Sequence, residues 1–259
     1  DAGAWNTAGH QDRVINVTLN ELETFAKLYD PPGTPALEAR LPALHTTTLL
    51  NILENFSEYS SRLESIQEGF RSTVMWDETN AVKKDHTIRR ETQFPKTPQE
   101  LILSGPHFFV GNPFYKSPRA VSKVNSDYDA IDLTVLPGDY LPRTNYVPDC
   151  VEAEYVARTP GVPWSKTTKV TDYYRFVNRE MLSQSGERTL IPSVIVPMSG
   201  HVHTVIETCF KNLDDLLAFY SSCLSLPVDF YIKSTGMGHC NTNLLNRIFI
   251  VSDKRAQNR

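Results

Sequence analysis

Apolar residues recur at helical spacing in three segments of the chain. The first covers Leu19–Tyr29, and the second runs from Leu44 to about Ile66, with Glu, Ser and Arg on the face opposite its apolar stripe. The third, Leu213–Leu224, follows Asn212, whose side chain is suited to cap a helix, and has two aspartates in its first turn. We predict a helix over each segment.

Short apolar or alternating runs predict strands in the rest of the chain: Ser72–Glu78, Ala130–Leu133, Lys169–Met181, Arg188–Val196 and His201–Thr208. The last three, with a turn at Gln184–Glu187, predict an antiparallel meander. The polar stretch Thr79–Pro98 is typical of a connection, and Lys116–Pro163 is predicted to consist mainly of loops.

Together these elements predict an α+β fold, in which an antiparallel meander sheet carries packed helices and long irregular loops. A helical N-terminal segment precedes the sheet. We expect residues 1–100 to form a helical linker or support and residues 101–259 to form the functional domain.

The composition is that of a globular protein, with 259 residues of which 40% are hydrophobic and 22% charged. No apolar run is long enough for a membrane span, and Asp1–Trp5 lacks the features of a signal peptide. The missing initiator Met indicates either a processed chain or a piece excised from a longer protein, and we favour the second. The four cysteines include no C-x-x-C pair, which favours reduced thiols and a cytoplasmic location without membrane contact.

The net charge of −4 argues mildly against a domain that binds nucleic acid unaided. The distribution is uneven, because acidic residues dominate positions 1–70. The C-terminal segment 231–259 instead holds five basic residues against one Asp. A module embedded in a larger enzyme can take part of its phosphate affinity from a neighbouring domain.

Two short stretches imitate the [D/N]-P-P-[aromatic] motif of amino-methyltransferases, in which a polar side chain binds the target amino group and an aromatic stacks on the base. Asp30–Gly33 has Gly in place of the aromatic, and Gly111–Phe114 lacks one proline. The chain has no glycine-rich strand-to-helix loop for a nucleotide cofactor; its G-x-G at Gly236–Gly238 lacks the following helix. We interpret both stretches as structural turns and expect no catalytic residue and no cofactor in this chain.

His201 and His203 are spaced to share one face of a strand, and two imidazoles so placed could hold a metal. No carboxylate or cysteine lies at a convincing companion spacing, although Glu207 lies further along the same face. We therefore favour packing or hydrogen-bonding roles for the two histidines and expect no metal site.

A polar, aromatic and basic set remains, gathered in and beside the predicted loops. Arg, Lys, Asn and Gln can pair with the edges of bases, and aromatic side chains can stack on them. For each member alone, a solvated or structural role is the simpler interpretation; the clustering is what suggests DNA contact. The candidates are Asn112, Tyr115, Lys116, Arg119, Arg143, Asn145, Arg175, Arg179, Lys233, His239 and Asn241.

The C-terminal part of the chain resembles a known family. The run Tyr173–Met181 (YYRFVNREM) and the run Glu187–Pro197 (ERTLIPSVIVP) resemble a segment of adenine-N6 DNA methyltransferases. The stretches Val228–Lys233 and Gly236–Asn241 follow in the same order. The similarity covers about Leu101–Val251. It is to the target-recognition domain, the TaqI-like C-terminal specificity domain, of type IIG restriction-modification and phage-defence methylases.

This resemblance implies a DNA sequence-recognition module that positions double-stranded DNA for a methyltransferase core. The core is absent from this chain and is expected N-terminal to Asp1 in the same polypeptide, where S-adenosylmethionine would bind. The parent would be a site-specific adenine DNA methyltransferase, with or without an endonuclease. Within the resemblance, Glu187, Arg188 and Thr189 are expected to brace the hairpin. The alternatives are a protein-interaction scaffold that works through the long N-terminal helix, and a self-contained enzyme of unfamiliar type.

Overall fold

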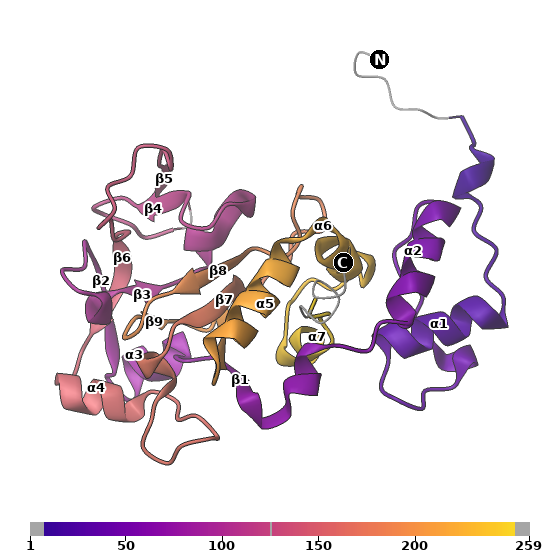
Figure 1. Cartoon of the computed structure of the whole chain (residues 1–259). Coiled ribbons are helices and arrows are strands. Elements are labelled where there is room, and N and C mark those ends of the chain that lie inside the picture. Colours follow the sequence, from indigo (N-terminus) through magenta and orange to yellow (C-terminus); the bar gives the residue numbers. More distant parts are fainter. Residues whose placement is uncertain (1–7, 125, 252–259) are drawn as a thin grey trace. The chain divides into compact units, whose positions relative to one another are not determined.

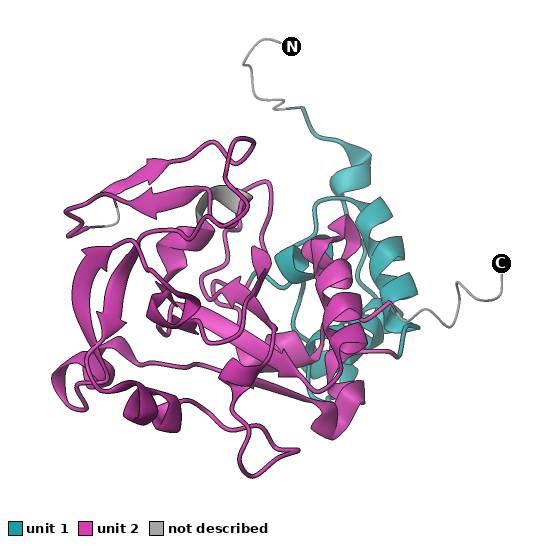
Figure 2. Ribbon diagram, turned by 60° about the vertical axis from the view of Figure 1, so that its left-hand side comes forward, with its two compact units in different colours: residues 1–60, 230–236 teal, residues 61–229, 237–259 magenta. Residues whose placement is uncertain are grey.

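The computed structural model describes residues 8–124 and 126–251 and has an α+β fold with antiparallel sheets (Figure 1). The chain forms two compact units, shown in different colours in Figure 2. The smaller consists of residues 1–60 and 230–236, and the larger of residues 61–229 and 237–259. The boundary differs from the one expected at residue 100, because residues 70–73 pair with a strand far along the chain and so belong to the larger unit.

The smaller unit is helical. Helix α1 (Leu19–Tyr29) has the predicted bounds, and its first turn is closed by a capping box in which Thr18 and Glu21 bind each other's backbone amides. Tyr29 stacks on Tyr231 with the ring centroids 5.6 Å apart. The hydroxyl of Tyr231 donates to the carbonyl of Leu28, which is fully buried. The other elements of the smaller unit are η1 (Gln11–Arg13), η2 (Ala36–Glu38), α2 (Thr47–Ser57) and the end of α6 (Leu226–Ser234).

The single long helix predicted from Leu44 to about Ile66 is wrong. Helix α2 ends at Ser57, and after an irregular stretch a 3-10 segment, η3, covers Leu63–Gly69. Leu63 is fully buried, and its amide donates to the carbonyl of Ile248 in the larger unit. The apolar stripe from Leu44 to about Ile66 is therefore continuous in the sequence, but its first part packs in the smaller unit and its last part in the larger unit.

The main sheet lies in the larger unit and has the order β1-β10-β7-β8, with every neighbouring pair antiparallel. Its order is not that of a simple meander, because β10 pairs with β1 and β7 and not with β8. Its strands are β1 (Phe70–Thr73), β7 (Arg175–Arg179), β8 (Pro192–Ile195) and β10 (Val205–Phe210).

Helix α5 (Leu213–Leu224), with the predicted bounds, packs on one face of this sheet (Figure 1). Phe219 of the helix contacts Phe176 and Phe210 of the sheet, with ring centroids 4.8 and 5.5 Å away. The opposite face of β7 carries Val177, which packs in a cluster with Leu103 and Phe108. Strand β7 is therefore buried on both faces.

In the described part of the larger unit, three small two-stranded sheets accompany the main sheet: β2 with β6, β4 with β5, and the parallel pair β3 with β9. Their strands are β2 (Ile88–Gln93), β3 (Ile102–Leu103), β4 (Lys116–Pro118), β5 (Tyr128–Ala130), β6 (Thr144–Pro148) and β9 (Gly200–His201). The remaining helices of the larger unit are α3 (Glu78–Lys83), η4 (Pro98–Glu100), η5 (Gly105–Gly111), α4 (Glu152–Arg158), η6 (Val170–Asp172) and α7 (Thr242–Asn246).

Several predicted elements differ from these bounds. The stretch Thr79–Pro98 is not a plain connection, because it contains most of α3 and all of β2. Residues 128–130 form the strand expected at Ala130–Leu133, and the predicted loop region Lys116–Pro163 also holds β4, β6 and α4. These short elements carry little periodic pattern, and pairing with distant strands decides them. In the described part of the chain, no helix has both the length and the apolar character required to cross a bilayer.

Candidate nucleic-acid interface

The strands β2, β4, β5 and β6 form a ribbon lobe, which we define as residues 88–94, 115–124, 126–131 and 143–148. Strands β2 and β6 pair along most of their length, and Gln93 lies opposite Thr144. Strand β4 pairs with β5, so that Lys116 lies opposite Ala130. Short strands of this kind hold loop residues in place, and five of the eleven candidates from the sequence lie on or immediately beside this lobe.

A buried polar network fixes the lobe from inside. The side-chain amide of Asn145 donates to the Tyr128 hydroxyl at 2.6 Å, and its carbonyl accepts from the Thr92 hydroxyl at 2.8 Å. Asn145 is only 4% exposed, and burial raises the pKa of the Tyr128 hydroxyl. Asn145 joins β6 to β2 and β5 and has little surface for DNA. Its candidacy as a DNA contact is corrected to a structural role.

His107 anchors the segment that carries Arg143. The His107 ring is fully buried, and its Nδ1 lies 3.1 Å from the Ser104 amide, from which it accepts. Its Nε2 lies 2.9 Å from the Arg143 carbonyl and donates to it, so the ring is neutral. Burial lowers the pKa of His107, which agrees with that state.

The Arg143 side chain lies over an exposed aromatic ring. Its guanidinium carbon is 4.3 Å from the centroid of Phe94, and one of its nitrogens donates to the carbonyl of Pro118. Phe94 is 53% exposed although it is a large apolar residue. A flat cation stacked on an accessible ring is an arrangement that can also accept the face of a base.

Two further cations belong to the same lobe. Arg90 on β2 donates from its guanidinium to the backbone carbonyl of Lys123, so the end of the Arg90 side chain lies beside the backbone of Lys123. Within the part of the chain that the structure describes, neither these two residues nor Arg143 forms a salt bridge. The adjacent Arg89 differs, since it pairs with Glu91 and Asp149.

Four candidates lie on β4 or in the segments next to it. Asn112 and Tyr115 line a wide, open hollow together with Ala130, Ile131, Asp132 and Leu133. Asn112 is exposed, whereas Tyr115 and Lys116 are half-buried. Arg119 is exposed, but its guanidinium is held by Asp129 at 2.8 Å. The structure brings Asn112 and Tyr115 to one hollow and compensates the charge of Arg119.

Arg175, a basic candidate on the predicted sheet, is buried, and its candidacy as a DNA contact is corrected. Its side chain has no exposed surface, and Nη1 lies 2.6 Å from the carboxylate of Glu207. A second nitrogen donates to the carbonyl of Ser199. The charge is used within the core, where no phosphate or base can reach it.

The remaining candidates divide in a similar way. Asn241 caps helix α7, with its side-chain oxygen accepting from the Leu244 amide at 2.9 Å, which gives it a structural role. His239 is exposed and lies 2.6 Å from a carboxylate oxygen of Glu180. Arg179 is half-buried at the end of β7, and burial lowers its pKa. Lys233 is half-buried and belongs to the smaller unit.

The run ERTLI is structural in part. The backbone amides of Thr189 and Leu190 both donate to the carboxylate of Asp229. Arg188 donates to the carbonyls of Cys223 and Leu224 at the end of α5. Arg188 and the backbone of Thr189 therefore tie the approach to β8 to the helices α5 and α6, whereas the bracing of the hairpin by Glu187, Arg188 and Thr189 stays a prediction.

The histidines and imitation motifs also have structural surroundings. His201 is fully buried beside Glu207, whereas His203 accepts a hydrogen bond from the amide of Glu78. No group of three or more His, Cys, Asp and Glu suited to a metal occurs in residues 8–124 and 126–251. Asp30 ends helix α1 and pairs with Arg40.

Arg90, Lys123 and Phe94 were missed from the sequence. Arg90 lies in a stretch interpreted as a connection, and Lys123 is an ordinary lysine in a predicted loop. A signal for Phe94 existed, because a Phe in the polar stretch Glu91–Gln99 has no apolar neighbours with which to form a core face.

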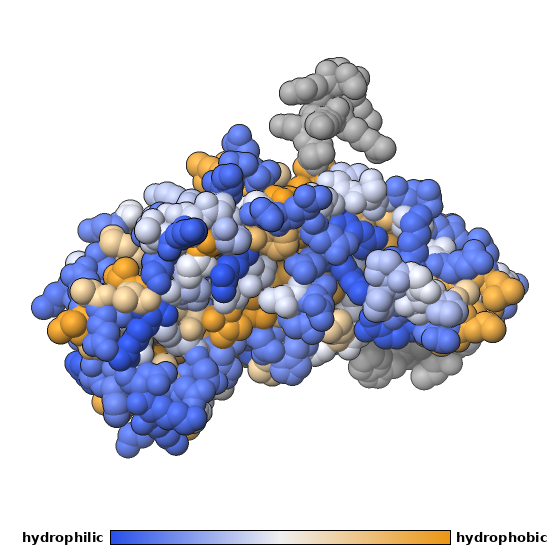
Figure 3. Space-filling view, turned by 90° about the horizontal axis from the view of Figure 1, so that it is seen from below, coloured by the Kyte–Doolittle hydropathy of each residue, from blue (hydrophilic) through white to orange (hydrophobic). Residues whose placement is uncertain are grey.

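The face of the molecule in Figure 3 is hydrophilic over most of its area, with apolar residues in small separate groups. No protein-family model matches the chain, and no curated protein matches it.

Proposed function

We propose that this chain is the DNA sequence-recognition module of an adenine-specific DNA methyltransferase or restriction-modification enzyme. In this proposal it positions duplex DNA for a methyltransferase core that lies elsewhere in the parent protein and binds S-adenosylmethionine. The runs Tyr173–Met181 and Glu187–Pro197 support it by their resemblance to target-recognition domains. A cytoplasmic location and a role in phage defence belong to the same proposal.

The observation that carries the proposal is the stacking of Arg143 on the exposed ring of Phe94, on a lobe that also carries Arg90 and Lys123. None of Arg90, Lys123 and Arg143 forms a salt bridge among the described residues, although the backbone amide and the charge of Lys123 help to lower the pKa of Asp127. Positive side chains without a partner are available for phosphates, and an exposed ring is available for a base or a sugar. Asn112 and Tyr115 line a further hollow on the same unit, and Lys116 begins the neighbouring strand β4.

The overall charge of −4 limits the strength of this binding. We expect a dissociation constant in the range of non-specific DNA binding, roughly 10⁻⁴ to 10⁻⁶ M, for the isolated chain. Stronger binding would require phosphate contacts from the methyltransferase core. Selection of bound duplexes from a random-sequence pool tests whether the chain also prefers a sequence.

Fluorescence anisotropy with a labelled duplex tests the surface. Affinity should fall steeply between about 50 and 200 mM salt, and a triple Arg90→Ala, Lys123→Ala, Arg143→Ala variant should reduce the salt slope by about three. Arg89→Ala is the matched control for Arg90→Ala, because it removes the same charge from the next position of β2 but breaks an ion pair within the lobe. Absence of binding at low salt, or equal effects of the two single variants, would contradict the proposed surface.

A further inference from the structure

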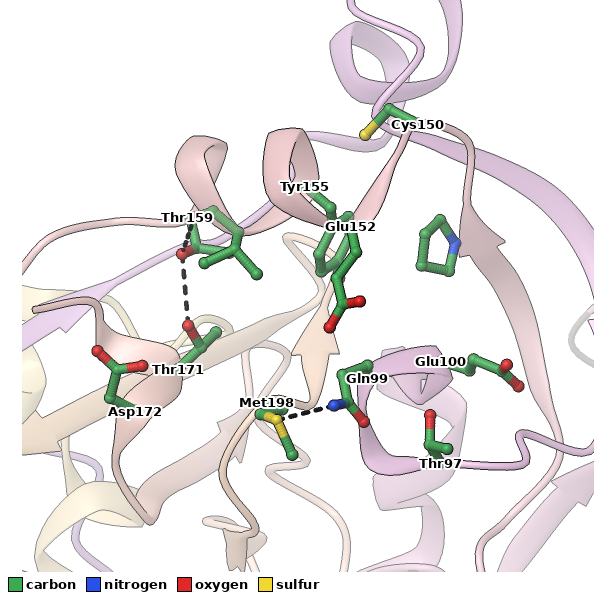
Figure 4. A pocket seen from close by; sticks show the side chains of 12 residues that line it. Thr97, Gln99, Glu100, Cys150, Glu152, Tyr155, Thr159, Thr171, Asp172 and Met198 are labelled. Carbon is green, nitrogen blue, oxygen red and sulfur yellow. Dashed lines mark hydrogen bonds between the residues drawn. The ribbon is translucent and has the colours of Figure 1, made fainter.

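The larger unit contains a second hollow, separate from the ribbon lobe surface around Phe94. It has a volume of about 420 Å³ and lies between helix α4 and the segments 97–100 and 171–172 (Figure 4). Its apolar wall consists of Pro148, Tyr155, Val156 and Met198. Small-molecule sites in proteins have volumes of about 300–1,000 Å³ and similar apolar walls.

All charged side chains that line this cavity are acidic. Glu100, Glu152 and Asp172 come from three different elements, and none of the lining residues is Lys, Arg or His. The carboxylate of Glu152 forms no hydrogen bond or ion pair with a described residue, and Figure 4 shows it extending from α4 toward Gln99 and Met198. Among the described residues, Glu100 and Asp172 each accept only a nearby backbone amide, from Lys96 and Lys169. The cavity therefore favours a cation.

The carboxylates are spread around the cavity. In Figure 4 Asp172 and Glu100 lie on opposite sides of the view, with Glu152 between them. Within the described residues they do not form a group that could hold a metal ion. One compact ion could not satisfy all three, whereas a flexible chain with several separated positive charges could approach each of them.

We propose that this cavity binds an aliphatic polyamine, an organic cation in which methylene segments separate ammonium groups. The methylene segments would contact Tyr155, Val156 and Met198, and the ammonium groups would pair with Glu152, Glu100 and Asp172. Thr97 and Gln99 add polar atoms at the rim that can accept hydrogen bonds from an ammonium group. This inference is independent of the proposed DNA binding.

Isothermal titration of the whole chain with spermidine tests the proposal. We expect one saturable site, weakened about threefold to fivefold by Glu152→Gln through loss of one ammonium–carboxylate pair. Glu154→Gln is the matched control, because it removes the same charge from the same helix while Glu154 pairs with Arg158. It should leave the affinity unchanged. Val156→Trp fills the cavity without a change of charge and should abolish binding.

Three results would overturn the polyamine site: no saturable binding, equal weakening by Glu152→Gln and Glu154→Gln, or unchanged binding to Val156→Trp. The first two would show only the general attraction of an acidic protein for cations. Equal affinity for butylamine and spermidine would also overturn it, because separated charges would then add nothing. Circular dichroism and thermal unfolding verify that each variant is folded; should Val156→Trp unfold, Glu100→Gln and Asp172→Asn must each weaken binding for the proposal to stand.

Discussion

Arg175 and Glu207 form a fully buried ion pair across the main sheet, with 2.6 Å between Nη1 and Oε2. Arg175 lies on β7 and Glu207 on the neighbouring β10, two positions apart on the same face. His201 Nε2 lies 3.3 Å from the same carboxylate oxygen, and Ser199 accepts a further hydrogen bond from Arg175. The pair thus connects the sheet to the segment that leads into β9.

Removal of one partner from this pair should be costly. Glu207→Gln leaves the Arg175 charge buried without its counter-ion, and we expect a loss of about 3–5 kcal/mol in the free energy of unfolding. Urea denaturation measures it. The double variant Arg175→Met, Glu207→Leu should lose less than the sum of the two single variants, and strict additivity would contradict the coupling.

The ion pair between Arg175 and Glu207 should also make the free energy of unfolding depend on pH in the acid range. Burial by itself would raise the pKa of the Glu207 carboxyl, but Arg175 and His201 outweigh it and hold that pKa below its usual value of 4.5. The stabilisation is therefore present above pH 4.5 and is lost as the pH falls through the folded-state pKa. Unfolding free energies at decreasing pH should fall more steeply for the wild type than for Glu207→Gln. Parallel curves below pH 4.5 would count against this assignment.

His107 should likewise make the free energy of unfolding fall with decreasing pH, but in a range closer to neutral. Burial lowers its pKa below 6.5, so the unfolded chain takes up a proton that the folded protein resists. The unfolding free energy should decrease as the pH falls from 6.5 toward the folded-state pKa. His107→Gln removes the titrating group and keeps a donor for the Arg143 carbonyl, so it should lack this decrease. A folded-state pKa of 6.5 or higher in an NMR titration would refute the assignment.

Asn241 should affect stability and leave DNA affinity unchanged. Its side chain caps α7, so Asn241→Ala should cost about 1 kcal/mol, while Asn241→Ser keeps an acceptor and should cost less. Thermal unfolding measures the first effect and anisotropy the second. A clear loss of DNA affinity in Asn241→Ser at unchanged stability would restore Asn241 as a DNA contact.

Phe94 should contribute to DNA affinity through its exposed ring. We expect Phe94→Ala to weaken binding by about 1–3 kcal/mol if the ring stacks on a base, with little change in stability because half of the side chain is already exposed. Val121→Ala is a control, as Val121 is 72% exposed but aliphatic. A duplex with 2-aminopurine separates stacking from simple contact. An unchanged fluorescence signal on binding would argue against stacking.

The sequence predicted the elements whose determinants are local. Helices Leu19–Tyr29 and Leu213–Leu224 have the predicted bounds, because an apolar stripe and the residues at the helix start suffice to define them. Even there, Asn212 occupies the cap position but its side chain bonds to Asp215 and not to a backbone amide. The α+β class with antiparallel pairing also followed from the pattern.

Only the tertiary structure decided which cations are accessible. Arg175 and Arg90 are the same residue type in short strands, yet one is fully buried and the other exposed. The difference arises because β7 lies between β8 and β10 under helix α5, whereas β2 pairs with β6 alone. Strand order depends on contacts between residues far apart in the chain, and no local pattern records them. The sequence by itself therefore determined the kinds of side chain available, and the packing of distant strands determined their use.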